Sequence, residues 1–403
     1  MIGLGYIGLP TAVVAANAGN SVLGIDVSDQ VIKGLKSQQV HIEEPGLEDE
    51  FKEAVSGGRL TFASRVENAD IHVIAVPTPF NSEKKPDLSY LESAALAVAD
   101  SLRKGDLVII ESTIPVGTTR AIHNLIASAR KDLEKRDIRI AHCPERVLPG
   151  HMLREIRQNH RVIGGISAEC ADMARNFYET FVTGECRVSN VETAELCKLA
   201  ENAYRDVNIA FANELSQISD DFEVSVWELR KLANLHPRVN ILSPGPGVGG
   251  HCIAVDPWFI VDASPAHSNL IRTAREVNDS KPQWVVDKII GAARAQQVTE
   301  IVCLGLTYKA DTDDVRESPA LSICGALASH GEYRVICVDP HVRDLPASLS
   351  QNRSVEFFSD LPRTTDSSLV IFLVGHSQFR AARLQVIENG SQVMDFCGIL
   401  QER

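Results

Sequence analysis

The stretch from Pro244 to Pro257 contains the side chain of this sequence best suited to covalent chemistry. Four glycines and two prolines lead up to Cys252, and Asp256 follows four residues later. Glycines let a ligand approach the main chain closely, and prolines reduce the entropy lost when a loop orders. If Cys252 opens a helical turn, backbone N–H groups stabilise its thiolate and Asp256 shares its face. The alternative is a tight turn around a cysteine that fills a small core site.

A second pair of candidate residues lies on a long predicted helix. Residues 191–221 contain no glycine or proline, and their apolar residues recur at helical spacing. Lys198 and Asn202 stand four residues apart and therefore share a face. Glu201 and Arg205 have the same spacing, which we interpret as a solvated ion pair. The helix is long enough to join two domains and to offer a dimer surface.

The N-terminal residues follow the pattern of a dinucleotide-binding turn. Gly3, Gly5 and Gly8 form a G-x-G-x-x-G motif, a helical stretch follows, and a short β-like run ends at Asp26. In such turns the glycines admit the pyrophosphate, the helix N-terminus faces phosphate, and the acid binds the ribose hydroxyls. A chance glycine turn does not explain the helix, strand and acid in that order. An acid at this place favours NAD over NADP.

The first strand of this pattern is nearly absent, because only Met1 and Ile2 precede Gly3. That strand normally lies at the centre of the sheet. We therefore expect a truncated or misassigned start. If the chain begins here, the sheet loses a central strand.

Three further apolar runs predict the strands of a doubly wound parallel sheet. Residues 71–76, 107–113 and 138–145 are short and rich in β-branched residues, and helical stretches separate them. Loops at the carboxyl ends of such strands contact the ligand, so the residues after these runs should meet at one crevice. The polar and proline residues at these ends are Pro77, Thr78, Pro79, Ser112, Thr113 and Glu145. Each proline also has a simpler interpretation as a residue that ends a strand.

A second α/β pattern occupies the C-terminal part of the sequence. Strand-like runs at 300–305, 334–339 and 368–374 alternate with helical stretches, one of them opened by Ser318 as cap and Pro319 as the first helical residue. The charged loop before this helix is long enough to reach across an interdomain cleft.

The whole pattern predicts an α/β fold with two Rossmann-like parallel-sheet domains joined by a long central helix. The 403 residues suit two or three domains. We place an N-terminal NAD-binding domain at 1–187, a central helical domain with the cysteine loop at 188–287 and a C-terminal α/β domain at 288–403. A helix is expected over 269–287.

Composition excludes several classes of function. The chain has 44% hydrophobic and 23% charged residues and a net charge of −13, which argues against a nucleic-acid or basic membrane-surface binder. No apolar run approaches the roughly 18–20 residues of a membrane span, and the first residues lack the pattern of a signal peptide. Nine cysteines without a C-x-x-C pair or zinc-ligand spacing predict free thiols in a reducing cytoplasm and no metal site.

Together these motifs resemble the UDP-glucose/GDP-mannose 6-dehydrogenase family, over essentially the whole chain and in the same order. The resemblance rests on the glycine motif, Ala75–Pro79, Glu111–Thr119, Cys143–Arg146, the Lys198–Asn202 helix, the cysteine loop and residues 309–316. Residues 236–240 and 245–259 are most similar to members that oxidise UDP-N-acetyl-D-mannosamine for surface polysaccharide. Members that oxidise UDP-N-acetylglucosamine have a similar Gly-Gly-His-Cys loop.

The resemblance implies a four-electron oxidation of a sugar's primary alcohol to a carboxylate, with two NAD⁺ reduced in turn. The aldehyde formed first must be held, because a second hydride can leave only from a tetrahedral adduct. A thiolate at Cys252 forms such an adduct, a thiohemiacetal, which is oxidised to a thioester and hydrolysed.

The family match also implies roles for polar residues around the thiol. Lys198 and Asn202 stabilise negative charge on the substrate oxygen, or Lys198 serves as the base of the first step. Asp256, helped by a water at Thr113, and Glu145 are alternative candidates for activating the hydrolytic water.

Two binding sites follow from the same match. The cofactor site comprises Gly3, Gly5, Tyr6, Ile7, Gly8, Asp26, Pro77, Thr78, Thr113 and Arg316. The UDP-sugar site comprises Glu145, Arg146, Val147, Leu148, Lys198, Asn202, Arg238, Gly249, Gly250, His251 and Lys309. Of these, His251 is interpreted first as a loop residue that shapes the pocket and alternatively as a direct substrate contact. Arg238 is expected to meet the sugar or its new carboxylate, from its own subunit or from a neighbouring one. A homodimer through the central helix is also expected.

Two other functions fit parts of the sequence. A two-electron dehydrogenase of a hydroxyacid would use the glycine motif, but it has no need of Cys252 in its loop or of the Lys198–Asn202 pair. A non-catalytic remnant is suggested only by the missing strand, whereas every candidate catalytic position is filled.

Overall fold

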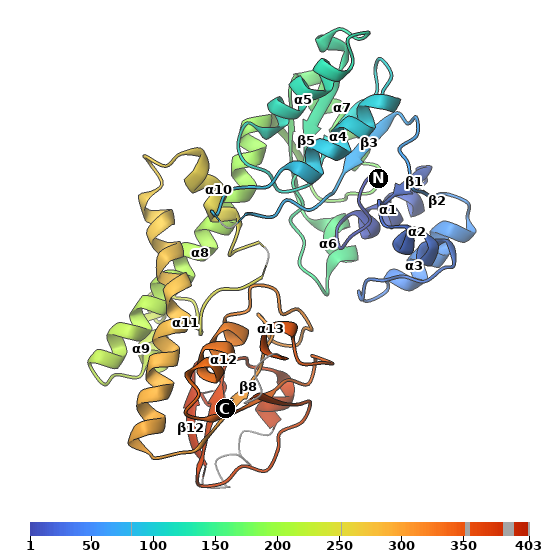
Figure 1. Ribbon diagram of the computed structural model, residues 1–403. Helices are drawn as coiled ribbons and strands as arrows, with labels where there is room; N and C mark the ends of the chain where they lie inside the picture. Colours follow the sequence, from blue (N-terminus) through green and yellow to red (C-terminus); the bar gives the residue numbers. More distant parts are fainter. Residues whose placement is uncertain (82, 251, 351–354, 382–390, 402–403) are drawn as a thin grey trace. The chain divides into compact units, whose positions relative to one another are not determined.

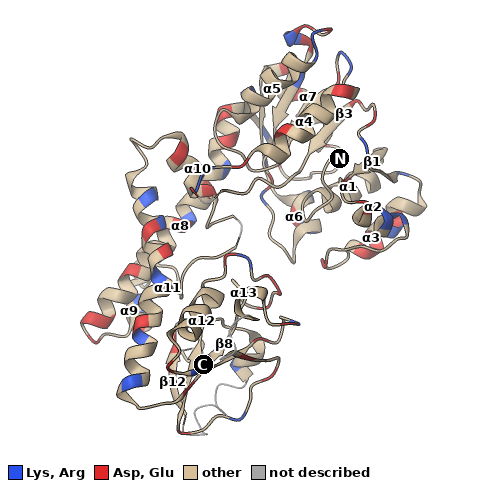
Figure 2. Ribbon diagram, in the orientation of Figure 1, with Lys and Arg blue, Asp and Glu red and all other residues tan. Residues whose placement is uncertain are grey.

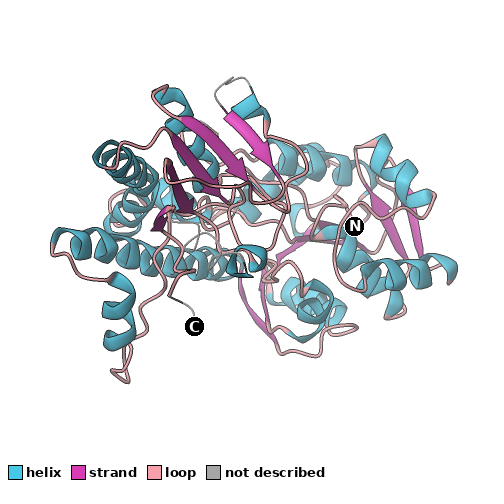
Figure 3. Cartoon of the chain, turned by 90° about the horizontal axis from the view of Figure 1, so that it is seen from below, coloured by secondary structure: helices cyan, strands magenta, loops and turns pink. Residues whose placement is uncertain are grey.

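The computed structural model describes residues 1–403 except 82, 251, 351–354, 382–390 and 402–403. The chain divides into two compact units, Met1–Glu201 and Asn202–Arg403. Each unit contains its own sheet of mainly parallel strands accompanied by helices, as Figures 1 and 3 show. The predicted α/β class is therefore confirmed.

The first unit has a five-stranded sheet in the order β3-β4-β5-β6-β7 and a parallel pair, β1-β2. The strands are β1 Val22–Ile25, β2 Leu60–Ala63, β3 Ile71–Ile74, β4 Leu107–Ile110, β5 Arg139–His142, β6 Arg161–Gly165 and β7 Cys186–Asn190. The helices are α1 Gly8–Asn17, α2 Asp29–Lys36, α3 Leu47–Ser56, α4 Ser89–Ser101, α5 Thr118–Ala129, α6 Met152–Gln158 and α7 Ala168–Tyr178, with a 3₁₀ turn at Lys135–Asp137. The sequence predicted strands at the positions of β1, β3, β4 and β5, but not β2, β6 or β7.

Ile2 lies where the sequence analysis expected a central strand. Its N–H donates to the Val73 carbonyl at 2.7 Å, and its carbonyl accepts from Ala75 at 2.8 Å. On the other side, the Gly3 N–H donates to Ile25 at 2.8 Å. Ile2 thus forms parallel bridges with both β1 and β3 and connects the pair β1-β2 to the larger sheet.

One strand pairing in the first sheet corrects the prediction of parallel strands throughout. β6 runs antiparallel to β5, with His142 opposite Gly164 and Ala141 opposite Gly165. A parallel neighbour requires a crossover that returns to the start of the previous strand. Here the chain instead enters β6 from the end at which β5 finishes. The first residue of β6, Arg161, therefore lies beside the residues that follow β5.

The long helix α8, Val191–Asp221, matches the predicted range 191–221 and belongs to both units. The second unit has a fully parallel sheet in the order β10-β9-β8-β11-β12. Its strands are β8 Glu300–Leu304, β9 Arg334–Val338, β10 Val355–Phe358, β11 Ser368–Phe372 and β12 Gln392–Asp395. Its helices are α9 Val226–Ala233, α10 Asp256–Ala263, α11 Asn269–Ala295, α12 Pro319–His330 and α13 Ala347–Ser350.

Two helices of the second unit test the sequence reading in detail. Ser318 caps α12 as predicted, since its hydroxyl accepts a hydrogen bond from the Leu321 N–H. The helix expected to end at 287 continues to Ala295, because Ile289 and Ala293 are fully buried and extend its apolar face.

The two α/β cores are built around uncharged helices. Neither α1 nor α12 contains a lysine, arginine, aspartate or glutamate, and both appear uniformly tan in Figure 2. Nine of the ten residues of α1 are buried, so this helix is enclosed on nearly every side. Among the helices of the described residues, none is both long and apolar enough to span a membrane.

Candidate functional site

The turn before α1 forms a cradle that only glycine can line. A Cβ on Gly8 would lie 1.9 Å from the Gly3 carbonyl oxygen, and one on Gly3 would lie 2.5 Å from that of Ala75. Gly3 also has a φ of +87°, which favours glycine. A Cβ on Gly5, in contrast, would meet no atom within 4 Å, so this face of the turn is open. The turn is therefore closely packed at Gly3 and Gly8 and has space for a ligand at Gly5.

The open side of this turn suits a dinucleotide. Residue Ile7 precedes α1 and gives the helix no side-chain cap, which leaves its N-terminal N–H groups suited to phosphate. Asp26 follows β1, and its two carboxylate oxygens accept hydrogen bonds from Leu4 and Ser28, each at 2.9 Å. These bonds fix the carboxylate beside the turn, and each oxygen keeps a lone pair for a ribose hydroxyl. Tyr6 is half exposed at the same turn. These residues fit an NAD cofactor.

Two loops at the carboxyl ends of β3 and β4 are joined by side-chain hydrogen bonds. Thr78 donates to the Thr113 carbonyl at 2.6 Å, and Ser112 donates to the Val76 carbonyl at 2.7 Å. Pro77 lies between these contacts. The structure thus brings together two of the three loops that the sequence placed at one crevice, those after β3 and β4.

Glu145 follows β5 and is 7% exposed. One of its oxygens accepts a hydrogen bond from the Arg146 N–H at 2.6 Å, and the other accepts from the Arg161 guanidinium at 2.7 Å. Its neighbour Arg146 points to Glu201, with an ion pair of 2.6 Å. The predicted Glu201–Arg205 pair is therefore wrong, because Arg146 takes the Glu201 carboxylate. Val147 packs on the first core, and Leu148 is exposed.

One face of α8 carries Glu195, Lys198 and Asn202 at intervals of three and four residues. The Glu195 carboxylate accepts hydrogen bonds from the N–H groups of Gly117 (2.6 Å) and Thr119 (2.7 Å) and from the Thr119 hydroxyl (2.6 Å). Glu195 therefore caps the N-terminus of α5, although it lies 78 residues after Gly117 in the sequence. Lys198 is half-buried, and within the described part of the chain its amine makes no hydrogen bond or ion pair.

Cys252 opens a helical turn, as the sequence suggested. Its carbonyl accepts hydrogen bonds from Val255 at 3.0 Å and from Asp256 at 2.8 Å, and α10 begins at Asp256. This i to i+4 bond places Asp256 on the face of Cys252. The Asp256 side chain is 3% exposed and accepts a hydrogen bond from the Asn202 amide. A half-buried thiol and a buried, oriented carboxylate thus share one short segment.

The glycines before Cys252 pack directly against the loop that leads to α12. A Cβ on Gly249 would lie 2.5 Å from the Glu317 carbonyl oxygen, and one on Gly250 would lie 2.9 Å from the Tyr308 ring. The Gly250 N–H donates to the Arg316 carbonyl at 3.1 Å. The pKa of Tyr308 is raised by burial and by the negative charges of Asp314 and Cys252, which places the phenol near the thiol. The two loops therefore form one assembly in the second unit.

Several predicted ligand residues are cations on exposed segments. Arg316 donates to Asp314 at 2.7 Å, so its guanidinium is held back on its own loop. Lys309 and Arg238 are exposed, and His251 lies outside the described residues. The structure thus places the cofactor turn, Thr113 and Glu145 in the first unit, and the thiol, Asp256 and the cationic loop in the second.

Three residues near these groups were not found by sequence reasoning. Glu195 lies three residues before Lys198, and this spacing was a usable signal. Arg161 was hidden because β6 was not predicted and its antiparallel pairing has no local signature. Tyr308 stands in the predicted substrate-side loop, but nothing in the sequence connects it to Cys252.

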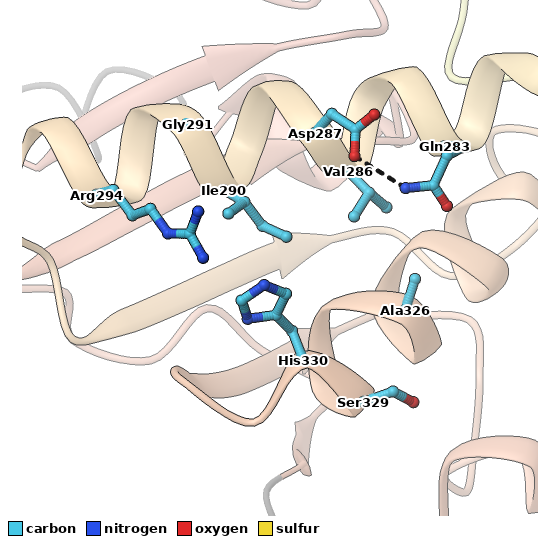
Figure 4. A pocket seen from close by; sticks show the side chains of 9 residues that line it. All are labelled: Gln283, Val286, Asp287, Ile290, Gly291, Arg294, Ala326, Ser329 and His330. Carbon is cyan, nitrogen blue, oxygen red and sulfur yellow. Dashed lines mark hydrogen bonds between the residues drawn. The ribbon is translucent and has the colours of Figure 1, made fainter.

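A groove between α11 and α12, of about 630 Å³, contains none of the predicted site residues (Figure 4). Its lining residues are Gln283, Val286, Asp287, Ile290, Gly291, Arg294, Ala326, Ser329 and His330. The one hydrogen bond drawn there runs along α11 from Gln283 to Asp287, at 2.9 Å. The groove is an irregularity between two packed helices.

Asp311, His341 and His376 also bring their donor atoms within 4.8 Å of one another. His376 is committed to protein partners, since its Nδ1 accepts from the Asp311 N–H at 3.0 Å and its Nε2 lies 3.1 Å from Asp339. These bonds account for the orientation of His376 without a metal ion.

Models of one protein family match nearly the whole chain. The NAD binding domain of the UDP-glucose/GDP-mannose dehydrogenase family matches residues 1–182, its central domain 192–280 and its UDP binding domain 302–402.

Relatives of known name show the same pattern. The chain is 51% identical to an NDP-N-acetyl-D-galactosaminuronic acid dehydrogenase of Ralstonia nicotianae, over 94% of this chain and 91% of that protein. It is 48% identical to the UDP-N-acetyl-D-mannosamine dehydrogenase of Escherichia coli, over 94% of both. The solved structure of a UDP-D-ManNAc dehydrogenase from Pyrococcus horikoshii superimposes with a TM-score of 0.89 at 37% identity, over 100% of this chain and 96% of that one.

Proposed function

The chain belongs to the UDP-glucose/GDP-mannose dehydrogenase family, and from this premise we propose that it oxidises UDP-N-acetyl-D-mannosamine to UDP-N-acetyl-D-mannosaminuronate. It is an NAD-dependent UDP-sugar dehydrogenase. The observation that carries the four-electron reaction is the segment from Cys252 to Asp256, which presents a thiol and an oriented carboxylate on one helical turn.

The thiol explains how one site performs two oxidations. The primary alcohol first loses a hydride and a proton and becomes an aldehyde; bound NAD⁺ accepts the hydride. The Cys252 thiolate then adds to the aldehyde carbon, and the oxygen takes a proton to give a thiohemiacetal. Transfer of a second hydride from that carbon to a second NAD⁺, which replaces the NADH formed first, together with loss of the hydroxyl proton, gives a thioester. Water cleaves the thioester, which releases the sugar acid and restores the thiol.

The polar residues divide this work in our proposal. The Lys198 amine, which has no hydrogen-bond or ion-pair partner among the described residues, stabilises the alkoxide of the alcohol and of the adduct. Asn202 orients the Asp256 carboxylate through their hydrogen bond, so that Asp256 acts near the thiol. Glu145 activates the hydrolytic water. This role is supported by the fixed orientation of its carboxylate, since both oxygens accept hydrogen bonds from N–H donors.

The other predicted residues retain binding roles in this proposal. Cofactor contacts come from the glycine turn, Asp26, Pro77, Thr78, Thr113 and Arg316. UDP-sugar contacts come from Arg146, Val147, Leu148, Arg238, Gly249, Gly250, His251 and Lys309. For Arg316 this requires that the guanidinium exchange Asp314 for the cofactor, a change within its own loop. Domains at 1–187, 188–287 and 288–403 are likewise our assignment.

The sugar's configuration has a second candidate. The Ralstonia relative, at 51% identity, has a name that specifies a galactosaminuronic acid, whereas the Escherichia relative at 48% acts on the manno sugar by its name. UDP-N-acetyl-D-galactosamine is therefore the alternative substrate. The motifs at 236–240 and 245–259 support the manno sugar.

A product assay tests the proposal. The protein is mixed with excess NAD⁺ and limiting UDP-N-acetyl-D-mannosamine, -galactosamine or -glucosamine or UDP-glucose, and NADH and the sugar acid are counted. We expect two NADH per manno sugar and the highest kcat/KM with that substrate. A preference for another of these sugars would identify that sugar as the substrate in place of UDP-N-acetyl-D-mannosamine. Absence of turnover with all four would refute the activity.

The thioester step has its own test. Cys252→Ser should stop net formation of the acid, because a neutral serine hydroxyl is a poorer nucleophile than a thiolate and the ester a less reactive intermediate than the thioester. Cys397→Ser is the matched control, since Cys397 is also half-buried in the second unit but belongs to no predicted site. Normal acid formation by the Cys252 variant would contradict the mechanism.

The biological setting is also a proposal. The product, a UDP-linked uronic acid, suits the synthesis of surface polysaccharide. Nine cysteines that all carry thiols in the structure support a reducing, cytoplasmic compartment. A homodimer through α8 is supported by apolar residues exposed along this helix.

A further inference from the structure

Four side chains meet in the interior of the first unit, just beyond the carboxyl ends of β4 and β5. Arg161 is the first residue of β6, which runs antiparallel to β5 with His142 opposite Gly164, so Arg161 lies toward the residues that follow β5. The guanidinium donates to Glu145 at 2.7 Å and lies 3.8 Å from Glu111. Tyr178, at the end of α7, completes the cluster by donating to Glu111 at 2.9 Å.

The cluster contains two carboxyl groups and one guanidinium, all withdrawn from water. Arg161 and Glu111 are each 1% exposed and Glu145 is 7% exposed. Two buried carboxylates that share one cation do not both ionise easily, because the second charge has no compensation. The cluster should therefore hold one proton over a range of pH that includes neutrality.

Hydrogen bonding indicates which carboxyl group holds this proton. Both oxygens of Glu145 accept N–H donors, an arrangement that stabilises the charged form. Glu111 receives one neutral donor, Tyr178, and its Oε2 is buried without a hydrogen-bond partner among the described residues. A bare oxygen is far more costly on a charged carboxylate than on a neutral acid. The geometry thus favours ionised Glu145 beside protonated Glu111.

The charged and titratable groups facing Glu111 come from every neighbouring element. Glu145 and the Cys143 thiol follow β5, Arg161 begins β6 and Tyr178 ends α7. The Met1 amine, whose own pKa burial lowers to about 5, donates to the Leu23 carbonyl of β1. Burial and the charge of Glu145 raise the pKa of Glu111 to about 7, against the opposing influence of Arg161, Tyr178 and the amine.

We propose that Arg161 and Glu111 are positioning residues for Glu145, with Arg161 holding its carboxylate in place and Glu111 carrying the proton of the cluster. This inference rests on the proposed role of Glu145 in activating water. When Glu111 is neutral, Arg161 is committed to Glu145 alone. When Glu111 ionises, the two carboxylates share Arg161, and the new negative charge makes Glu145 more basic. The proton on Glu111 therefore tunes the base that cleaves the thioester.

The proton itself is tested without any assay of activity. The protein is labelled with ¹³C at the glutamate carboxyl carbons, and NMR spectra are recorded from pH 5 to pH 9. We expect one carboxyl resonance that titrates near neutral pH and is missing from Glu111→Gln. Glu44→Gln is the control, because Glu44 is also buried but accepts two backbone N–H groups. Absence of a neutral titration, or its survival in Glu111→Gln, would overturn the assignment.

The positioning role is tested by kinetics on the full chain. Arg161→Lys keeps the positive charge but loses the planar guanidinium, so it should lower kcat at least tenfold while both KM values change less than threefold. Arg139→Lys, a half-buried arginine on the neighbouring strand β5, is the control and should keep kcat within twofold.

The pH profile gives the second kinetic readout. The inflection of kcat near neutral pH should be absent from Glu111→Gln, since an amide does not titrate. An unchanged kcat in Arg161→Lys, or an unchanged inflection in Glu111→Gln, would refute the positioning role. If the wild type turns over no UDP-sugar, the proposed activity fails instead, and the NMR titration still decides where the proton resides.

Discussion

Environment separates Cys252 from the other thiols of this chain. Burial raises the pKa of Cys143 to about 12. Hydrogen bonds with the Cys303 and Cys337 thiols, together with burial, raise the pKa of Cys324 well above its usual value. Such thiols stay protonated and inert at neutral pH. Cys252 is half-buried, opens a helical turn and lies near Tyr308. Its position, not its residue type, makes it the candidate nucleophile.

At the same scale, Glu111 should make the protein's stability depend on pH. The pKa of Glu111 is raised from 4.5 in an unfolded chain to about 7 in the fold. Between these values the folded state holds a proton that the unfolded state has lost, so the contribution to stability is complete below pH 4.5 and disappears as the pH rises through 7. The loss should amount to about 3 kcal/mol.

Glu111→Gln provides the comparison, because the amide cannot ionise. Free energies of unfolding are measured by urea denaturation of both proteins from pH 4 to pH 8.5. The wild type should lose stability relative to the variant between pH 4.5 and 7, and the difference should be constant above pH 8. Parallel curves across this range would show that Glu111 ionises normally.

At the scale of elements, α8 is fixed to the first unit through a hydrogen-bonded contact. Helices normally begin with a cap from a residue just before them. For α5 that residue is Gly117, which has no side chain, and the carboxylate of Glu195 on α8 replaces the cap. Lys198 lies about one turn after Glu195 on the same face of α8. By fixing this part of α8, the cap also helps to position the Lys198 amine. The contact thus links the loop that contains Thr113 to the face of α8 that carries Lys198 and Asn202.

Removing this cap should destabilise the fold. Glu195→Ala leaves the buried N–H groups of Gly117 and Thr119 without acceptors, which should lower the free energy of unfolding by about 2 kcal/mol or more. Glu192→Ala is a matched control one turn earlier, since it removes a partly exposed pair with Arg120 and should cost at most about 1 kcal/mol. Urea denaturation measures both. Equal losses would show that Glu195 is not a cap.

At the scale of the whole molecule, periodicity and motif order predicted the α/β class, α8 and the local geometry of Cys252. These features depend on residues close together in sequence. The pairing of Arg161 with Glu145 and the cap from Glu195 to Gly117 join residues that are remote in sequence, and the pattern of a single strand or helix does not contain them. The reversed direction of β6 is also a property of the connection, not of its apolar residues. Sequence reasoning therefore named candidate reacting groups but not the remote residues that hydrogen-bond to the site.

The assembly of the molecule gives the last prediction. Tyr204, Phe211 and Ile218 follow one another at seven-residue intervals on α8 and are 73%, 54% and 43% exposed. This spacing keeps them on one face, and such a stripe is costly in water unless another surface covers it. A second copy of the same helix, packed antiparallel about a twofold axis, would bury the stripe against itself.

Light scattering should therefore give the wild type twice its 44.0 kDa chain mass and Phe211→Glu the mass of one chain. Tyr90→Glu changes an equally exposed aromatic on α4 and should remain dimeric. A wild-type monomer would refute the dimer, and a dimer of the Phe211 variant would place the subunit contact elsewhere.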